Sequence, residues 1–293
     1  MTLRYDLGEL VTAMVTPMNQ DGTVNYDKAE ELANYLVENE SDAILVAATT
    51  GESPTLEHEE ELEILSSVKR AVAKRAKIIM NAGSNSTAYA VKYAKLAEKE
   101  ECIDAILSVV PYYNKPSQEG MYAHFASVAE AVDLPIILYN IPSRTGVNLM
   151  PKTIKRLYDN YKNIVGVKQS CADMDLVSEI KSLTGDDFAI YSGDDTLTLP
   201  MLALGAHGVV SVASHLYGPE LKRMITLFKA GNLAEAREIH ENLFYKMKKL
   251  FMAPNPVPVK AALQRRGLIK DYVRKPLVQL SEEEKNELFS VVQ

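Results

Sequence analysis

The stretch Ile164-Val165-Gly166-Val167-Lys168-Gln169-Ser170 indicates the kind of fold that this chain adopts. Its apolar residues are mostly β-branched and follow one another without polar alternation, as in a parallel strand buried on both faces. A lysine in such a strand must find a partner, reach water or lose its charge. A neutral lysine amine is a nucleophile that forms imines with carbonyl compounds. The alternatives for Lys168 are a structural ion pair or an exposed strand end.

Eight short runs of this kind occur in the chain, and each is followed by a longer run with helical periodicity. The strand-like runs are Leu10–Val15, Ala43–Ala47, Ile78–Asn81, Ala105–Val110, Ile136–Asn140, Ile164–Lys168, Phe188–Ser192 and Val209–Val212. The helix-like runs are residues 26–39, 57–74, 87–100, 118–132, 151–161, 174–183, 196–204 and 218–230. Strict alternation of eight pairs predicts a closed (β/α)8 barrel of parallel strands with right-handed crossovers. An open doubly wound sheet is the alternative, although five or six strands are more usual for it.

The strand-like runs stop near residue 231, and only helix-like runs follow. These runs are Leu233–Leu250, Pro258–Arg266 and Ser281–Val292. We therefore predict a (β/α)8 barrel over residues 1–230 that carries the active site, and a C-terminal helical region over residues 231–293. The chain of 293 residues is long enough for such a barrel, which typically needs about 250.

Composition and charge narrow the classes of partner. The formal net charge is −7, which argues against nucleic acid, and no apolar run approaches the length of a membrane span. The N-terminus shows no signal peptide, and Cys102 and Cys171 form no CxxC pair, so a reducing cytoplasm is expected. The five histidines are scattered without the spacing of metal ligands, so no metal site is predicted.

Active sites of (β/α)8 barrels lie at the carboxyl ends of the strands, so the residues after each strand-like run are the candidates. They are Thr49-Thr50-Gly51-Glu52-Ser53, Pro111-Tyr112-Tyr113-Asn114, Tyr139-Asn140-Ile141-Pro142-Ser143-Arg144-Thr145-Gly146, Lys168, Ser192-Gly193-Asp194-Asp195 and Gly208-Val209-Val210-Ser211. Threonines can hold a carboxylate, tyrosines can relay protons, and an arginine can clamp a second carboxylate. The set indicates an α-keto acid held as an imine and an acceptor that carries a carboxylate. Helix caps, rim packing and surface ion pairs are the structural alternatives for these residues.

These motifs resemble the dihydrodipicolinate synthase family, within the pyruvate-dependent class I lyase and aldolase superfamily. The resemblance spans nearly the whole chain, from Val15-Thr16-Pro17-Met18 to Pro254-Asn255-Pro256-Val257-Pro258-Val259-Lys260. Thr49-Thr50-Gly51-Glu52 and Gly166-Val167-Lys168 mark the superfamily. The Ser143-Arg144 pair within Tyr139–Gly146 marks the synthase branch, and Pro111-Tyr112-Tyr113 points the same way.

The resemblance implies a lyase of the diaminopimelate and lysine pathway that uses no cofactor beyond a covalent pyruvate imine on Lys168. The enamine formed from this imine would attack L-aspartate 4-semialdehyde, and cyclisation would follow. The residues that match the family's proton relay are Thr49, Tyr113 and Tyr139.

The resemblance also implies how substrates are held. Thr50 would bind the pyruvate carboxylate and Arg144 the semialdehyde carboxylate, while Gly193 and Val210 would shape the pocket through backbone groups. The family is usually a homotetramer built from two tight dimers. In it, the tyrosine that matches Tyr113 reaches into the neighbouring subunit's active site.

Some positions depart from the family pattern. Ala48 replaces a glycine that is common before the two threonines, and Gln169 stands where the synthase often has glutamate. Glutamine also occurs there in sialate lyases. Another pyruvate Schiff-base aldolase, acting on sialate or a keto-deoxy sugar acid, is therefore the alternative function. A non-catalytic barrel is a third hypothesis, which the joint presence of Lys168, Tyr139 and Thr49 disfavours.

The lysine-feedback site of the family is matched only in part. Four residues match those of inhibited members, namely Ser53, His58, Asn85 and Tyr112. Glu61 stands where a second histidine can occur, and Tyr89 where a glutamate can occur. Because the loss of that carboxylate removes a partner for a cationic amine, we expect weak or absent inhibition by L-lysine.

Overall fold

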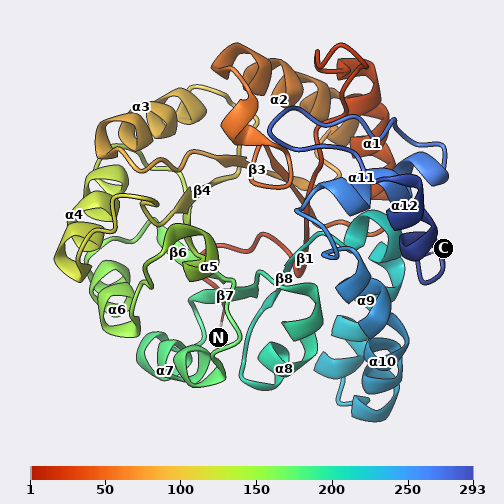
Figure 1. The fold of residues 1–293 in the computed structure, drawn as a ribbon. Helices are drawn as coiled ribbons and strands as arrows, with labels where there is room; N and C mark the ends of the chain where they lie inside the picture. The colour runs from red at the N-terminus through yellow and green to blue at the C-terminus, as the bar shows by residue number, and fades with distance from the viewer. Residues whose placement is uncertain (1, 293) are drawn as a thin grey trace. The chain divides into compact units, whose positions relative to one another are not determined.

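The strands of this protein form a closed parallel barrel in a computed structural model that describes residues 2–292 (Figure 1). They follow chain order around the barrel. Their bounds are β1 Leu10–Ala13, β2 Ala43–Val46, β3 Lys77–Asn81, β4 Ala105–Val109, β5 Ile136–Asn140, β6 Ile164–Gln169, β7 Ala189–Ser192 and β8 Gly208–Ser211. The predicted (β/α)8 barrel is therefore confirmed, and every strand overlaps the run that predicted it.

Helices alternate with these strands as the periodicity predicts. The main ones are α1 Tyr26–Glu38, α2 His58–Val72, α3 Thr87–Glu98, α4 Gln118–Ala129, α6 Pro151–Asn160, α7 Met174–Thr184, α8 Thr198–Ala203 and α9 Ser214–Lys229. The C-terminal helices are α10 Leu233–Lys249, α11 Val257–Arg265 and α12 Glu282–Phe289. Two short elements were not predicted, namely η1 Ser53–Thr55 and α5 Pro142–Thr145, whereas η2 Asp195–Leu197 overlaps the predicted helix-like run 196–204. All three lie in the segments that follow β2, β5 and β7, where candidate site residues lie.

Helix α9 spans Ser214–Lys229, but a kink at Tyr217 divides it, and its longer part begins at the predicted residue 218. Pro219 lies inside α9, and Tyr217 just before it has non-helical angles of φ −132° and ψ 33°. Proline is tolerated in the first turn of a helix, so Pro219 fits a helix that begins again just after the kink.

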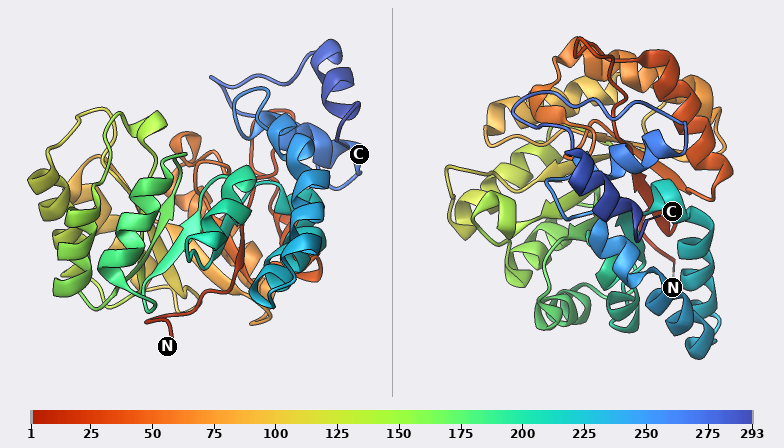
Figure 2. Two further views of the ribbon diagram at one scale, coloured as in Figure 1. Left: turned by 90° about the horizontal axis from the view of Figure 1, so that it is seen from below. Right: turned by 45° about the vertical axis from the view of Figure 1, so that its right-hand side comes forward.

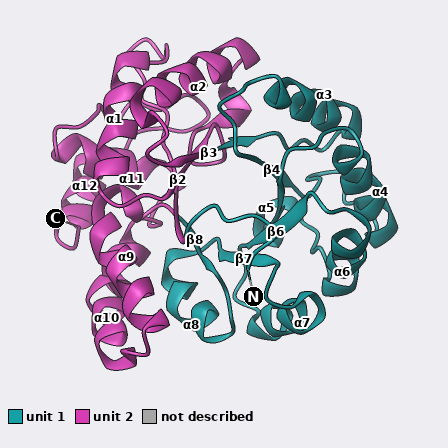
Figure 3. Cartoon of the chain, turned by 180° about the vertical axis from the view of Figure 1, so that it is seen from behind, with its two compact units in different colours: residues 1–8, 78–210 teal, residues 9–77, 211–293 magenta. Residues whose placement is uncertain are grey.

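The chain divides into two compact units, shown in different colours in Figure 3. Unit 1 comprises residues 1–8 and 78–210, and unit 2 comprises residues 9–77 and 211–293. In unit 2, α9 packs on β1, α10 packs on α9, and α11 packs on α12 (Figures 1 and 2). Helix α9 ends at Lys229. The boundary between residues 230 and 231 stays a prediction.

Strand register in unit 1 aligns the candidate lysine with two tyrosines. Strands β5 and β6 are buried along their whole length, and Lys168 pairs with Tyr139 on one side and with Tyr191 on the other. Paired residues of neighbouring parallel strands point to the same face of a sheet. Gly166 lets β6 approach β7, because a Cβ at this position would lie 2.4 Å from the Ala189 carbonyl oxygen.

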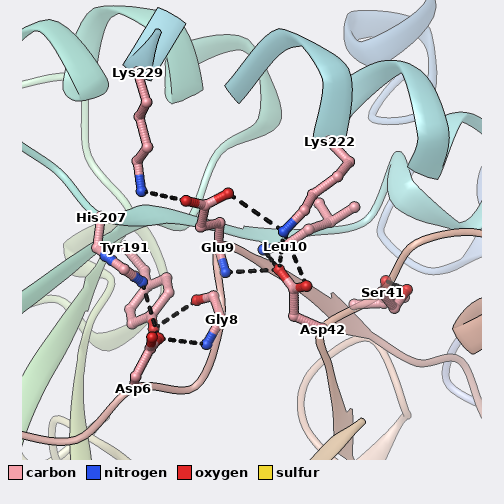
Figure 4. Close-up of polar contacts among 11 residues, drawn as sticks. Asp6, Gly8, Glu9, Leu10, Ser41, Asp42, Tyr191, His207, Lys222 and Lys229 are labelled. Carbon is pink, nitrogen blue, oxygen red and sulfur yellow. Dashed lines mark hydrogen bonds and ion pairs between the residues drawn. The ribbon is translucent and has the colours of Figure 1, made fainter. Parts of the chain in front are cut away.

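Ion pairs in unit 2 fasten α9 to the amino ends of β1 and β2 (Figure 4). The Asp42 carboxylate accepts hydrogen bonds from the backbone of Glu9 at 2.7 Å and of Leu10 at 2.9 Å. It also accepts one from Lys222 Nζ at 2.6 Å, and Lys229 Nζ bonds Glu9 at 2.7 Å. Residues at this end of a (β/α)8 barrel serve stability. Within residues 2–292, no helix is both long and apolar enough to cross a bilayer.

Candidate active site

Lys168 lies near the carboxyl end of β6 with only 5% of its surface exposed. Its Nζ lies 4.2 Å from the centroid of the Tyr139 ring on β5. The face of an aromatic ring attracts an ammonium group, and the ring also shields it from water. Lys168 makes no direct ion pair with the described residues, so the ion-pair alternative does not apply. An amine at this place can react with a carbonyl compound that reaches it.

Gly193 follows β7 and approaches Lys168 through its backbone. A Cβ at this position would lie 1.7 Å from Ser170 Oγ and 3.2 Å from Lys168 Cε, so only glycine fits. Val210, in β8, is 3% exposed. Next to Gly193, burial raises the pKa of the Asp194 carboxyl, while the charge of Lys168 opposes this shift. The pocket-shaping roles of Gly193 and Val210 stay predictions.

Gln169 points to the opposite face of β6 from Lys168. Its Oε1 accepts a hydrogen bond from Asn140 Nδ2 at 3.1 Å, and its Nε2 donates to Cys171 Sγ at 2.9 Å. Asn140 in turn bonds Asn148 Oδ1 at 2.6 Å and the Leu149 backbone N–H at 3.0 Å. Gln169 therefore supports the loop after β5, which gives this departure from the family pattern a structural explanation.

Tyr112 and Tyr113 lie on the loop after β4, and Arg144 lies on the short helix α5 after β5; all three are more exposed than Lys168. Arg144 belongs to α5, which its C-cap Gly146 closes through a hydrogen bond to the Pro142 carbonyl at 2.9 Å. Tyr112 is 41% and Tyr113 88% exposed, and Tyr113 has a left-handed φ of 72°. Within the described chain, no hydrogen bond joins these side chains to Lys168. The structure thus places Tyr139 and Gly193 at Lys168, while the roles of Tyr113 and Arg144 stay predictions.

In unit 2, the two threonines after β2 form a tight, well-supported turn. Thr50 is 3% exposed, and its Oγ1 accepts a hydrogen bond from Asn255 Nδ2 at 3.0 Å. Thr49 is half-buried, and its carbonyl accepts the Glu52 backbone N–H at 3.1 Å. Thr16 Oγ1 bonds the Gly51 carbonyl at 2.7 Å. These bonds fix the backbone on which both threonines are presented.

Glu52 and Lys260 form a buried ion pair that sequence reasoning missed. Lys260 is fully buried and bonds the Glu52 carboxylate and the Tyr272 carbonyl, the latter at 2.8 Å. The backbone N–H of Arg274 donates to Glu52 Oε2 at 2.9 Å. Burial lowers the pKa of Lys260, although Glu52 opposes this shift. The C-terminal segment thereby holds the turn that carries the two threonines.

The residues of the predicted lysine-feedback site fall into two groups. In unit 2, Ser53 Oγ bonds Glu61 at 2.9 Å, and His58 Nδ1 lies 3.6 Å from the same carboxylate. Burial raises the pKa of Glu61 to about 7, although the bond from Ser53 opposes this shift.

In unit 1, Asn114 Nδ2 donates to the Asn85 carbonyl at 2.8 Å, which ties the loop of Tyr112 to that of Asn85. Tyr89 is 55% exposed and stacks on Tyr93 with the ring centroids 6.2 Å apart. The regulatory role of these residues stays a prediction. Elsewhere too, the described residues contain no group of three or more histidine, cysteine or acidic side chains placed to hold a metal ion.

Comparison with known proteins gives close matches over nearly the whole chain. The model of the dihydrodipicolinate synthetase family matches residues 6–293. The 4-hydroxy-tetrahydrodipicolinate synthase of Synechococcus elongatus is 50% identical over 98% of this chain and 95% of its own.

Solved structures agree with this result. The DHDPS of Cyanidioschyzon merolae, solved with lysine bound, superimposes with a TM-score of 0.95 at 46% identity, over 97% of each chain. The chloride-inhibited dihydrodipicolinate synthase of Acinetobacter baumannii, solved in complex with pyruvate, gives a TM-score of 0.94 at 36% identity, over 98% of each chain.

Proposed function

Because this chain belongs to the dihydrodipicolinate synthetase family, we propose that it condenses pyruvate with L-aspartate 4-semialdehyde. It would thus act as a 4-hydroxy-tetrahydrodipicolinate synthase, a lyase of the diaminopimelate and lysine pathway. The observation that carries the proposal is the buried Lys168 amine against the Tyr139 ring. A binding protein has no use for an imine-forming lysine in this place.

The chemistry begins with attack of the neutral Lys168 amine on the keto carbon of pyruvate. Loss of one water gives the imine, and loss of a methyl proton gives the enamine. The enamine carbon then attacks the aldehyde carbon of the semialdehyde, and a proton converts the aldehyde oxygen to a hydroxyl group. The amino group of the semialdehyde finally attacks the imine carbon, which closes the ring and releases the lysine.

Proton transfer and carboxylate binding are assigned to the remaining candidates as part of the same proposal. Tyr139 lies at the lysine and can relay protons with Thr49 and with Tyr113 of a neighbouring subunit. Thr50 would hold the pyruvate carboxylate with neighbouring backbone N–H groups, and Arg144 would hold the carboxylate of the semialdehyde. The fixed turn around Thr50 supports its role, because a preorganised donor costs little to align.

The alternative of an aldolase for sialate or another sugar acid rested on Gln169. In the structure, this side chain bonds Asn140 and Cys171 on the face opposite Lys168. It therefore carries no information about the acceptor. The synthase assignment keeps its support from Arg144, since a polyhydroxylated acceptor requires hydrogen-bonding groups in place of a carboxylate clamp.

The test is a coupled assay with pyruvate, L-aspartate 4-semialdehyde, the next reductase of the pathway and NADPH. We expect turnover that depends on both substrates, and pyruvate-dependent inactivation by borohydride. Lys168→Ala should lose both, whereas Lys152→Ala, an exposed lysine on α6, should retain both. Borohydride inactivation without turnover of the semialdehyde would move the protein to the aldolase alternative. Borohydride inactivation that persists in Lys168→Ala would refute the assignment of the nucleophile.

A further inference from the structure

Ser170 is a buried hydroxyl beside the reactive lysine, and none of the roles above uses it. It is 5% exposed, and its Oγ finds no hydrogen-bond partner among residues 2–292. Buried hydroxyl groups are almost always bonded, and an unpaired one is costly. The orphaned Oγ therefore requires an explanation, and a bound molecule is one that would supply its partner.

The position of Ser170 places this hydroxyl beside both Lys168 and Gly193. It follows β6 directly and lies two residues after Lys168, so in extended backbone both side chains point to the same side. A Cβ added to Gly193 would lie 1.7 Å from Ser170 Oγ and 3.2 Å from Lys168 Cε, so both side chains approach Gly193. The Ser170 backbone N–H is bonded to the Asn140 carbonyl at 2.9 Å, which fixes the start of the side chain.

We propose that the Ser170 hydroxyl donates a hydrogen bond to the aldehyde oxygen of the acceptor, the oxygen that becomes the new hydroxyl group of the product. This inference rests on the proposed function. In that reaction, Thr50 and Arg144 account for the two carboxylates, and the keto oxygen of pyruvate leaves as water. The aldehyde oxygen is the substrate oxygen without an assigned partner.

This assignment makes Ser170 a catalytic residue of the carbon–carbon bond-forming step and not of imine formation. Negative charge develops on the aldehyde oxygen as the enamine attacks, and a preorganised hydroxyl donor stabilises that charge. Imine formation with pyruvate does not involve this bond.

The experiment compares Ser170→Ala with the wild-type protein by borohydride trapping, steady-state kinetics and thermal unfolding. We expect an unchanged rate of pyruvate trapping by borohydride and an unchanged KM for pyruvate. We expect kcat/KM for the semialdehyde to fall about ten-fold, the scale of one lost hydrogen bond to a developing charge. We also expect an equal or higher melting temperature, because the substitution removes an unpaired buried hydroxyl.

Ser108→Ala is the matched control. Ser108 is a fully buried serine of β4 whose Oγ also finds no partner among the described residues. Ser108 pairs with Leu138, whereas Lys168 pairs with Tyr139. Because successive residues of a strand point to opposite faces, Ser108 points to the opposite face from Lys168. This variant should retain full activity with both substrates.

Three results would overturn the proposal. An unchanged kcat/KM for the semialdehyde in Ser170→Ala would show that no such bond exists. Equal losses for both substrates with a lower melting temperature would show that Ser170 is structural. A wild-type protein that traps pyruvate but does not convert the semialdehyde would refute the proposed function itself and, with it, this inference.

Discussion

Arg144 is the residue that most directly separates a carboxylate-bearing acceptor from a sugar-acid acceptor. It is exposed on the short helix α5, away from structural ion pairs among the described residues. Arg144→Ala should therefore raise the KM for the semialdehyde about 100-fold, the scale of a lost charge-assisted pair, and leave that for pyruvate nearly unchanged. Steady-state kinetics with each substrate varied in turn would show this difference.

Arg156→Ala is the control for that measurement, because Arg156 is an exposed arginine of α6 that pairs with Glu119 on the surface. It should leave both KM values unchanged. Equal increases for the two substrates in Arg144→Ala would mean that Arg144 shapes α5 or binds pyruvate instead.

Single residues were predictable from the sequence where their neighbours made them unusual. Lys168 is conspicuous because every residue before it in the strand is apolar or glycine. Asn255 and Ser170 gave no such signal. Asn255 bonds Thr50, which lies about two hundred residues earlier in the sequence. The prolines on either side of Asn255 suggested only a turn. The importance of Ser170 depends on an absent hydrogen bond, which no sequence pattern records.

At the level of elements, the segment before α11 is coupled to the turn after β2. The only hydrogen bond from Asn255 Nδ2 among the described contacts goes to Thr50 Oγ1, and this fixes the orientation of the threonine hydroxyl. Asn255→Ala should raise the KM for pyruvate roughly ten-fold, since Thr50 would lose its positioning partner. Borohydride trapping as a function of pyruvate concentration would measure the effect.

A hydrogen bond elsewhere in the C-terminal region provides the comparison. Gln279 Nε2 bonds Asp271 at 2.6 Å, away from Thr50. Gln279→Ala should lower the melting temperature about as much as Asn255→Ala does, but it should not change the KM for pyruvate. If both variants changed the KM equally, the effect would reflect a general loosening of the C-terminal region.

The loops of the predicted regulatory site support a prediction about L-lysine. Tyr89 provides a stacked ring where inhibited family members can have a glutamate, so a cationic amine lacks one carboxylate partner. We expect no strong inhibition by L-lysine at submillimolar concentration. Tyr89→Glu should increase the sensitivity, and Tyr93→Phe should not. Strong inhibition of the wild-type protein would show that the remaining residues suffice.

The order of elements was predictable because it depends on local periodicity, and eight βα pairs leave few topologies. The short elements η1 and α5 were not predictable, because each is a single turn and too short to show helical periodicity. The turn of α9 before its kink, residues 214–216, was not predicted for a related reason, since one turn is too short to show helical periodicity.

At the scale of the whole molecule, two buried histidines should make stability depend on pH. His215 Nε2 accepts the Val15 backbone N–H at 3.1 Å, so its Nδ1 carries the proton and donates to the Val212 carbonyl at 2.8 Å. Burial lowers the pKa of His215 and of His124 to about 4. Between pH 6.5 and 4 the unfolded chain therefore binds more protons than the folded one. Stability falls as pH falls through this window, by on the order of 3 kcal/mol for each histidine.

Glu61 opposes this trend, because its pKa is raised to about 7 in the folded state. Its contribution to stability is present below its unfolded pKa and is lost as pH rises toward 7. Calorimetry from pH 4.5 to 7.5 should therefore show a steeper rise of stability with pH in Glu61→Gln than in the wild-type protein. Identical slopes would mean that Glu61 is ionised in the folded protein near neutral pH.

Tyr113 connects the fold of one subunit to the assembly. Its side chain is 88% exposed on a backbone with a φ of 72°, a conformation that is unfavourable for a bulky residue. Strain of this kind persists where a functional contact requires it, and we expect that contact in the active site of a second copy. A site would then combine Lys168 of one subunit with Tyr113 of its neighbour, within the predicted homotetramer. Sedimentation should show the tetramer.

Mixing two inactive variants tests whether the neighbour completes the site. Lys168→Ala and Tyr113→Phe should each be inactive or nearly so alone. After dissociation and reassociation of an equal mixture, a hybrid dimer has one site with both residues intact, so activity should recover toward about a quarter of wild type. A mixture of Lys168→Ala with Lys168→Met should gain nothing. If the first mixture also gained nothing although hybrids had formed, Tyr113 would act within its own subunit, and the active site would not depend on assembly.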